Sequence, residues 1–208
     1  MVARRPYHQG VKLDELRGGG APTLGEPLPI ELGNATYAAR GRLVDGLQTV
    51  EHVAAWFRDN RHRFAVPLDD GDLLRTNERD LAATRALRDA VRTLTGVAVR
   101  GGDAPQEAVE TVNQQVRAAP RWRELSWGGG PRALACGSVD RLATARAEIA
   151  QQAVDLFGGP DIAQLRACHA PGCVLYFLKD HPRREWCSAG CGNRARAARH
   201  YERNRKTS

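Results

Sequence analysis

Apolar residues recur at helical spacing along the first two thirds of the chain. Between Leu47 and Phe57 they stand three or four positions apart, which predicts an amphipathic helix over residues 46–58. The same spacing predicts a long helix near residues 77–95 and a third helix from about residue 105 to residue 118. These segments indicate a mostly helical body.

A β-hairpin and a fourth helix are predicted next. The apolar residues Trp122, Leu125 and Trp127 are followed by Gly128-Gly129-Gly130-Pro131, and Leu134 and Cys136 come after this turn. Two short segments with alternating apolar residues around a glycine turn are typical of a hairpin. The fourth helix, marked by apolar residues over 142–156, is expected to have Ser138 as its N-cap and Gly158 as its stop.

Several apolar residues of this body are expected to serve packing. Trp56, Trp122 and Trp127 could line a ligand pocket, but core packing is the favoured use of each. Cys136 is expected to be a small core residue of the hairpin rather than a redox thiol.

The fold class predicted from these patterns is α+β. Residues 1–27, rich in glycine and proline and without periodicity, are expected to form a flexible N-terminal tail. Residues 28–160 form a mostly helical domain with a β-hairpin, and Gly158-Gly159-Pro160 marks its end. Residues 161–208, which hold four of the five cysteines, form a small separate module with a basic C-terminal helix.

Composition excludes the membrane and secretory classes. The chain has 208 residues, of which 42% are hydrophobic and 26% charged, as in a globular protein with one core and a small added module. No stretch approaches the apolar length of a membrane span, and the N-terminus lacks the apolar region of a secretory signal. A cytoplasmic location is expected, where close cysteine pairs are metal ligands rather than disulfides.

Four of the five cysteines form two close pairs near the C-terminus. They stand as Cys168-x4-Cys173 and Cys187-x3-Cys191, with 13 residues between the pairs. This spacing is typical of a structural zinc site, in which four thiolates hold one tetrahedral ion and leave no position for water. One structural Zn²⁺ per chain is therefore expected, and metal binding supplies stability that so short a segment cannot gain from a core.

The residues around these cysteines predict a hairpin followed by a helix. Leu165–Cys168 is expected to be the entering strand and Val174–Phe177 the returning strand, and a helix begins at Cys187–Cys191. This is the order of a treble-clef finger, which places thiolates at a helix N-terminus where N–H groups stabilise their charge. His169 is expected to be an exposed loop residue, and Tyr201 to lie on the inner side of the helix.

The positive charge of the chain is concentrated in this module. Residues 166–208 hold 10 Lys or Arg and 3 acidic residues, so the whole net charge of +7 resides there. Such a basic surface can neutralise phosphates, and its helix can lie in a major groove of double-stranded DNA. The alternative is a solvated helix whose cations complement only its own dipole. The cations expected to contact nucleic acid are Arg183, Arg184, Arg194, Arg196, Arg199, Arg203, Arg205 and Lys206.

The finger and the body resemble known families. Trp186-Cys187-Ser188 and Cys191-Gly192-Asn193-Arg194, followed by a basic helix, resemble the CGNR zinc finger, and the four-residue signature is intact. In that family the finger follows an ABATE domain of stress-induced transcription regulators, and Leu28–Thr36 is similar to the opening of that domain. The resemblance implies a bacterial, cytoplasmic, zinc-binding and DNA-binding transcription regulator that responds to a ligand or to stress.

Other roles stay open from the sequence. The finger could bind protein or RNA without binding DNA, and Tyr176, Phe177 and Tyr201 offer stacking surfaces for RNA. Its thiolates could form a zinc-thiolate redox switch. Asn193 and Arg194 could contact DNA or support the local backbone and thiolates. The body could bind an unidentified small-molecule effector or form a homodimer that presents two fingers to two half-sites.

No catalytic residue is expected. Asp180-His181 lies between the cysteine pairs, as an Asp-His pair does in HNH nucleases, but the 13-residue gap is short and Pro182 follows directly. The chain has no glycine-rich phosphate loop, no G-x-S-x-G and no H-E-x-x-H sequence. The expected function is therefore binding and not catalysis.

Overall fold

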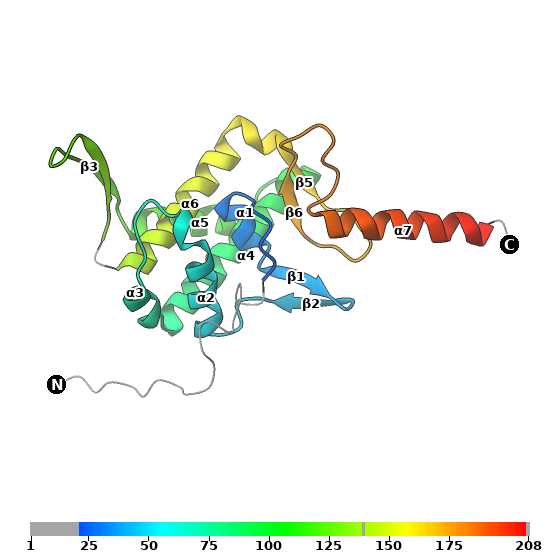
Figure 1. Ribbon diagram of the computed structural model, residues 1–208, viewed down its shortest axis with the longest axis horizontal. Helices are drawn as coiled ribbons and strands as arrows, with labels where there is room; N and C mark the ends of the chain where they lie inside the picture. The colour runs from blue at the N-terminus through cyan, green and yellow to red at the C-terminus, as the bar shows by residue number, and fades with distance from the viewer. Residues whose placement is uncertain (1–20, 139, 207–208) are drawn as a thin grey trace.

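The computed structural model describes residues 21–138 and 140–206 (Figure 1). In chain order the first part contains α1 (Leu28–Gly33), β1 (Thr36–Ala39), β2 (Arg42–Asp45), α2 (Val50–Asn60), η3 (Arg61–Arg63), α3 (Asp70–Leu74), α4 (Glu78–Arg100), α5 (Gln106–Ala118), β3 (Trp122–Ser126), β4 (Arg132–Cys136), α6 (Arg141–Gly158) and η4 (Pro160–Gln164). The finger follows as β5 (Leu165–Ala167), β6 (Tyr176–Leu178) and α7 (Ala189–Lys206). The strands form three antiparallel pairs, β1-β2, β3-β4 and β5-β6. The predicted α+β fold class, with a helical body and a small C-terminal finger, is confirmed.

The core of the body surrounds α4, which packs against α1, α2, α5 and α6. Leu87 and Val91 on α4, Phe57 on α2 and Ile149 on α6 are completely buried in one cluster. Burying a side chain of this size contributes roughly 1.5–3 kcal/mol. The apolar stripes that predicted these helices are therefore the faces that form the core.

The helices begin where side chains cap them. Thr49 accepts the His52 N–H, so α2 starts at Val50, four residues after its predicted start. The fourth predicted helix, α6, is capped by Asp140, whose carboxylate accepts the Ala143 N–H at 2.8 Å. The prediction of Ser138 as this N-cap was wrong, because its hydroxyl instead donates to the Asp140 carbonyl oxygen at 3.0 Å.

The β3-β4 hairpin forms as predicted but stands away from the helices (Figure 1). Trp122 is 51% exposed and Trp127 is 71% exposed, whereas Trp56 is buried in the core. The prediction that all three tryptophans pack in the core was therefore wrong for the two in the hairpin. Cys136 is half-buried at the base of the hairpin and is not a core residue, because no core forms around this hairpin in the described part of the chain.

The segment before α1 is packed rather than tail-like. Ala21 and Glu26 are buried, and the backbone N–H groups of Leu24 and Glu26 donate to the Glu31 carboxylate at 2.7 and 3.0 Å. The prediction of a flexible tail as far as residue 27 was therefore wrong for residues 21–27, and its part before residue 21 lies outside the described residues. No helix in the described ranges is both long and apolar enough to cross a membrane.

Candidate metal centre and basic helix

The finger brings its four cysteines together. Cys168 follows β5, Cys173 lies in the connection to β6, and Cys187 and Cys191 flank the first residues of α7. Their four sulfur atoms lie within 4.8 Å of one another. The Sγ atoms of Cys173 and Cys187 are 3.8 Å apart, and those of Cys187 and Cys191 are 3.4 Å apart. His169 is exposed and outside this group.

This geometry fits a tetrahedral metal ion. Four metal–sulfur bonds of about 2.3 Å place the sulfur atoms of a tetrahedron about 3.8 Å apart. All five cysteines are free thiols, so no disulfide competes for these sulfurs. The four side chains are therefore positioned to hold one metal ion with a complete set of protein ligands.

The electrostatics of the cluster favour a bound cation. Hydrogen bonds from the thiols of Cys173 and Cys187 lower the pKa of Cys168. The interaction with Cys168, reinforced by Cys173 and by burial, raises the pKa of Cys187. Four sulfurs this close cannot all become thiolates without an opposite charge among them, and a divalent ion supplies that charge.

The residues of the CGNR signature have distinct local roles. Cys191 is a candidate ligand, and its N–H donates to the Ser188 hydroxyl at 3.2 Å. A Cβ atom at Gly192 would lie 3.0 Å from the Trp186 ring, so glycine allows that ring to pack on the helix. The Arg194 guanidinium donates to Cys191 Sγ at 3.1 Å. Asn193 accepts a hydrogen bond from Arg196. Arg194 therefore supports the sulfur of a candidate ligand, and its contact with DNA stays a prediction.

Polar side chains of the body dock the finger. The Asn34 amide donates to the Tyr176 carbonyl oxygen and accepts the Tyr176 N–H, both at 2.9 Å, as a neighbouring strand would. Arg92 on α4 donates to the Gly33 and Val174 carbonyl oxygens at 3.1 and 2.9 Å. The same guanidinium lies 5.4 Å from the centre of the Tyr176 ring. The hairpin of the finger is thus held against α1 and α4.

A buried ion pair completes this contact. Glu26 is 2% exposed, accepts the Leu178 N–H at 2.9 Å and pairs with Arg184, which lies over the Phe177 ring. Burial raises the pKa of Glu26, while the Leu178 N–H and the Arg184 guanidinium oppose that rise. Arg184 was predicted to contact DNA. Its guanidinium is engaged by Glu26 on the body, so Arg184 has a structural role at this contact, and its contact with DNA stays a prediction.

Sequence reasoning gave no role to Glu26 or Arg92. Arg184 is 158 positions from Glu26, and Val174 is 82 positions from Arg92. No local pattern marks such pairs. The only signal near them was the LPIELGNAT segment, which contains Asn34.

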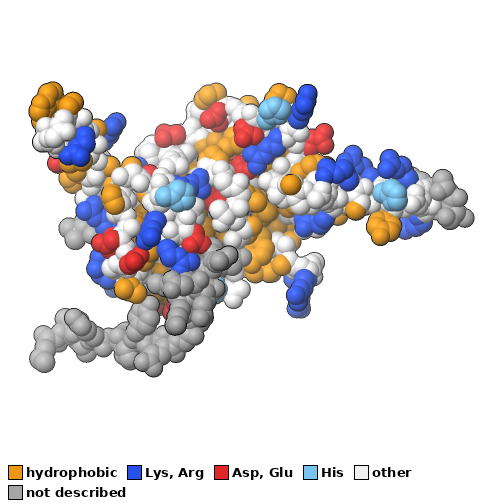
Figure 2. All heavy atoms as spheres, in the orientation of Figure 1, with side chains coloured by type: hydrophobic (Ala, Val, Ile, Leu, Met, Phe, Trp, Pro, Cys, Tyr) orange, Lys and Arg blue, Asp and Glu red, His pale blue; other side chains and the backbone are white. Residues whose placement is uncertain are grey.

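The other cations remain on the surface. α7 projects from the molecule, and blue side chains follow it in the space-filling view (Figures 1 and 2). Within α7, only the three positions Cys191, Gly192 and Ala195 are buried among the residues whose side chains are described. The side chain of Lys206 lies outside the description. The exposed predicted cations are Arg183, Arg194, Arg196, Arg199, Arg203 and Arg205.

The aromatic residues of the finger differ in exposure. Tyr201 is 76% exposed, so the prediction that it lies on the inner side of the helix was wrong. Phe177 is buried, and Tyr176 is half-buried beneath Arg92. Of the three aromatic side chains considered for base stacking, Tyr201 alone is exposed.

These features define a class, namely a helical body joined to a four-cysteine zinc finger. Residues 26–160 match the model of the ABATE family, described as "Putative stress-induced transcription regulator", and residues 164–204 match the CGNR zinc finger. The chain therefore belongs to the ABATE family and carries a CGNR zinc finger. No curated protein sequence matches it.

Proposed function

We propose that this chain is a transcription regulator that binds double-stranded DNA through α7, with one structural Zn²⁺ fixing the start of that helix. The observation that carries the proposal is an 18-residue helix that projects from the body and buries little beyond its first turns. Helices in proteins gain most of their stability from packing an apolar face. The outer part of α7 lacks such a face, so it requires another kind of partner.

The charges on α7 indicate the chemistry of that partner. Its sequence contains six basic residues and one acidic residue, Glu202. Arg196, Arg199 and Arg203 are three or four positions apart and therefore share a face, where like charges repel. Phosphates on both sides of a groove would relieve this repulsion, and the major groove, about 12 Å wide, admits an α-helix.

Zinc is the proposed metal because four cysteine ligands form a closed thiolate site, the usual arrangement of structural Zn²⁺. Bound zinc would hold β5, β6 and the start of α7 together and thereby orient the basic helix. Thiolate ligands stay reduced in the cytoplasm, where we place the protein.

We also propose that the regulator is a homodimer joined through the β3-β4 hairpin. An isolated two-stranded hairpin is only marginally stable in water. This one exposes Leu125 by 71% and Leu134 by 45%, besides its two tryptophans, and neither strand has a further sheet partner in the described residues. A second copy would cover these side chains, and a dimer presents two fingers to two half-sites.

The proposed function is binding without catalysis. The Asp-His pair between the cysteine pairs has local structural partners: Asp180 pairs with Arg184, and His181 accepts the Arg183 N–H at 3.1 Å. RNA binding by stacking has only Tyr201 exposed among the candidate aromatics. Duplex DNA is therefore the nucleic acid that the surface favours.

The test is a titration of random-sequence duplex DNA with zinc-loaded protein at several salt concentrations. Fluorescence anisotropy measures the affinity at each salt concentration. Changing Arg196, Arg199 and Arg203 to alanine should reduce the slope of log affinity against log salt by about 3, since each phosphate contact contributes about 0.9. The control changes the exposed body residues Arg42, Arg79 and Arg117, all outside the β3-β4 hairpin, to alanine, which removes the same charge.

The two variants separate a specific surface from net charge. An equal loss of duplex affinity in both variants would show that only the total charge of the protein matters. That result would contradict binding through α7. Full duplex affinity in the α7 variant, with zinc content unchanged, would also contradict it. Zinc without duplex affinity in the unaltered protein would leave the finger as a protein-docking element.

A further inference from the structure

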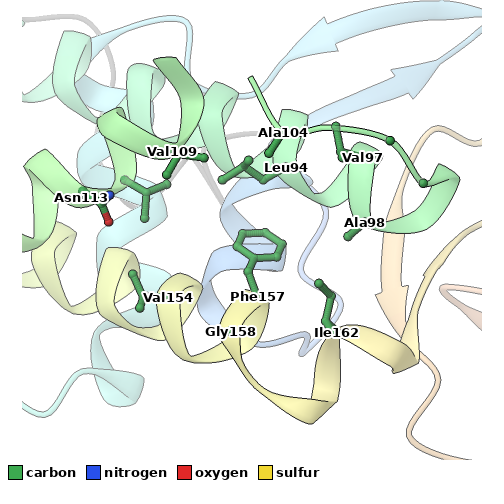
Figure 3. Close-up of a pocket in the computed structure, with 13 residues that line it drawn as sticks. Leu94, Val97, Ala98, Ala104, Val109, Asn113, Val154, Phe157, Gly158 and Ile162 are labelled. Atoms are coloured by element: carbon green, nitrogen blue, oxygen red, sulfur yellow. The ribbon is translucent and has the colours of Figure 1, made fainter. Parts of the chain in front are cut away.

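The body contains a pocket that the proposed DNA contact does not use. It has a volume of about 610 Å³ and lies between α4, α5, α6 and η4. Figure 3 shows Leu94 and Phe157 facing each other across it, with Val109 on one side and Ile162 on the other. Pockets of about 300–1,000 Å³ are typical of small-molecule sites, whereas protein cores are otherwise closely packed.

The residues that line the pocket indicate which class of ligand it can bind. None of the described residues that line the pocket is charged, and most are aliphatic or aromatic. Burying a charged group against such a surface is costly. The polar side chain of the lining is Asn113 on α5, whose amide makes no hydrogen bond within the described part of the chain. An amide both donates and accepts, so it can orient one hydroxyl, carbonyl or amide group.

One rim of the pocket is a short connection between helices. Gly101 and Gly102, which line the pocket, have φ angles of +80° and +113° and lead from α4 towards α5. Their conformation is in the left-handed region that glycine tolerates. Across the pocket, Val154 on α6 is 39% exposed, so this edge opens to solvent and gives a ligand a way in.

The pocket shares residues with the joint between body and finger. Phe157 and Ile162 line the pocket and also pack in a cluster with Leu165 of β5 and Leu178 of β6. Along the chain, η4 ends at Gln164 and β5 begins at the next residue. Cys168, a candidate metal ligand, comes three residues after Leu165. A displacement of Phe157 or Ile162 would therefore act directly on the strand that leads to the metal centre.

We propose that this pocket binds one uncharged, largely apolar small molecule, with Asn113 bonding its polar group, and that occupancy is transmitted to the finger through Phe157 and Ile162. The regulatory step rests on the proposed DNA-binding function, whereas ligand binding itself does not. The ligand class follows from the absence of charge in the described lining and from the single free amide.

Binding is tested on the full, zinc-loaded chain with the uncharged fluorescent probe N-phenyl-1-naphthylamine. One probe should bind per chain, and 1-decanol should displace it much better than decanoate does. Val154→Trp places a larger ring at the exposed rim and should weaken probe binding by about tenfold or more. Leu43→Trp, at an exposed position of β2, and Trp127→Ser, in the hairpin, should leave it unchanged.

The outcomes separate the pocket from other apolar surfaces. The site would be overturned if the probe showed no saturable binding, or if decanoate displaced it as well as 1-decanol does. Unchanged probe binding in Val154→Trp would also overturn it. Loss of probe binding in Trp127→Ser would place the probe on the hairpin and would also overturn it. Asn113→Leu should keep the probe but weaken 1-decanol, because the hydrogen bond to its hydroxyl is lost.

Transmission is tested by two independent readouts. Saturating 1-decanol should change amide hydrogen exchange in residues 162–168 and should change duplex affinity at fixed salt. If the protein binds no duplex, the proposed function fails, while probe binding and hydrogen exchange still decide this inference. Ligand binding that alters neither exchange in these residues nor duplex affinity would overturn the transmission step.

Discussion

At the scale of single residues, Arg194 joins the metal centre to the basic helix. Its guanidinium donates to Cys191 Sγ at 3.1 Å while the rest of the side chain is exposed. A charged donor to a metal-bound thiolate stabilises the ionised sulfur and fixes its direction. The residue that is fourth in the CGNR signature thus supports the candidate metal ligand that is first in it.

Replacing Arg194 with alanine should weaken zinc binding by about 10- to 100-fold, the usual effect of losing a group that supports a metal ligand. Competition with a chromogenic chelator measures this affinity. Arg205→Ala removes the same charge from an exposed position on the same helix and should leave zinc affinity unchanged. Equal zinc affinity in both variants would show that Arg194 does not support the thiolate.

The roles of single residues could be predicted where similar residues recur close together in the sequence. They could not be predicted where a role depends on a partner far along the chain. The spacing of the two cysteine pairs predicted a metal site, and the structure brings the four cysteines together. Arg184 and Arg183 are indistinguishable in sequence, yet Arg184 is paired with Glu26, far along the chain. Glu26 in turn follows a glycine and precedes a proline, which indicated a solvated tail. Its burial depends on the finger, which no local pattern reveals.

At the scale of elements, long amphipathic segments were predictable and short buried ones were not. α5 occupies Gln106–Ala118, close to the prediction, because its apolar stripe repeats over several turns. α1 has six residues, all buried, so it offers no contrast between an apolar and a polar face. The β1-β2 hairpin, with four residues in each strand, is too short for alternation to be visible.

The β3-β4 hairpin carries the element-scale prediction. Leu125→Ser should shift the monomer–dimer equilibrium towards monomer by about tenfold, since removing a large apolar side chain from an interface commonly costs more than 1 kcal/mol. Sedimentation velocity over a range of concentrations measures the shift. Leu43→Ser is the matched control, because Leu43 is 68% exposed and Leu125 is 71% exposed. A monomeric unaltered protein, or equal effects of both substitutions, would contradict a dimer formed through this hairpin.

At the scale of the whole molecule, two cores of different origin are joined by polar contacts and by a small apolar cluster that includes Ile30 of the body with Leu165 and Leu178 of the finger. The body has its own apolar cluster around α4, whereas the cluster of the finger consists largely of the cysteines with Ala170, Leu175 and Phe177. A core as small as the second cannot stabilise a fold without a metal. Asn34 and Arg92 attach the finger to a body that has its own core, so we expect the body to stay folded without the finger.

Removing the metal should therefore unfold the finger and leave the body folded. With excess chelator, hydrogen exchange should become fast in β5, β6 and α7 and stay slow in α4, and far-UV circular dichroism should lose the signal of up to 18 helical residues. Cys173→Ser should reproduce this state without chelator, whereas Cys136→Ser, outside the cluster, should not. If α4 lost its protection together with α7, the two parts would form one cooperative unit. The finger would then be integral to the fold, and a ligand in the body could not loosen it alone.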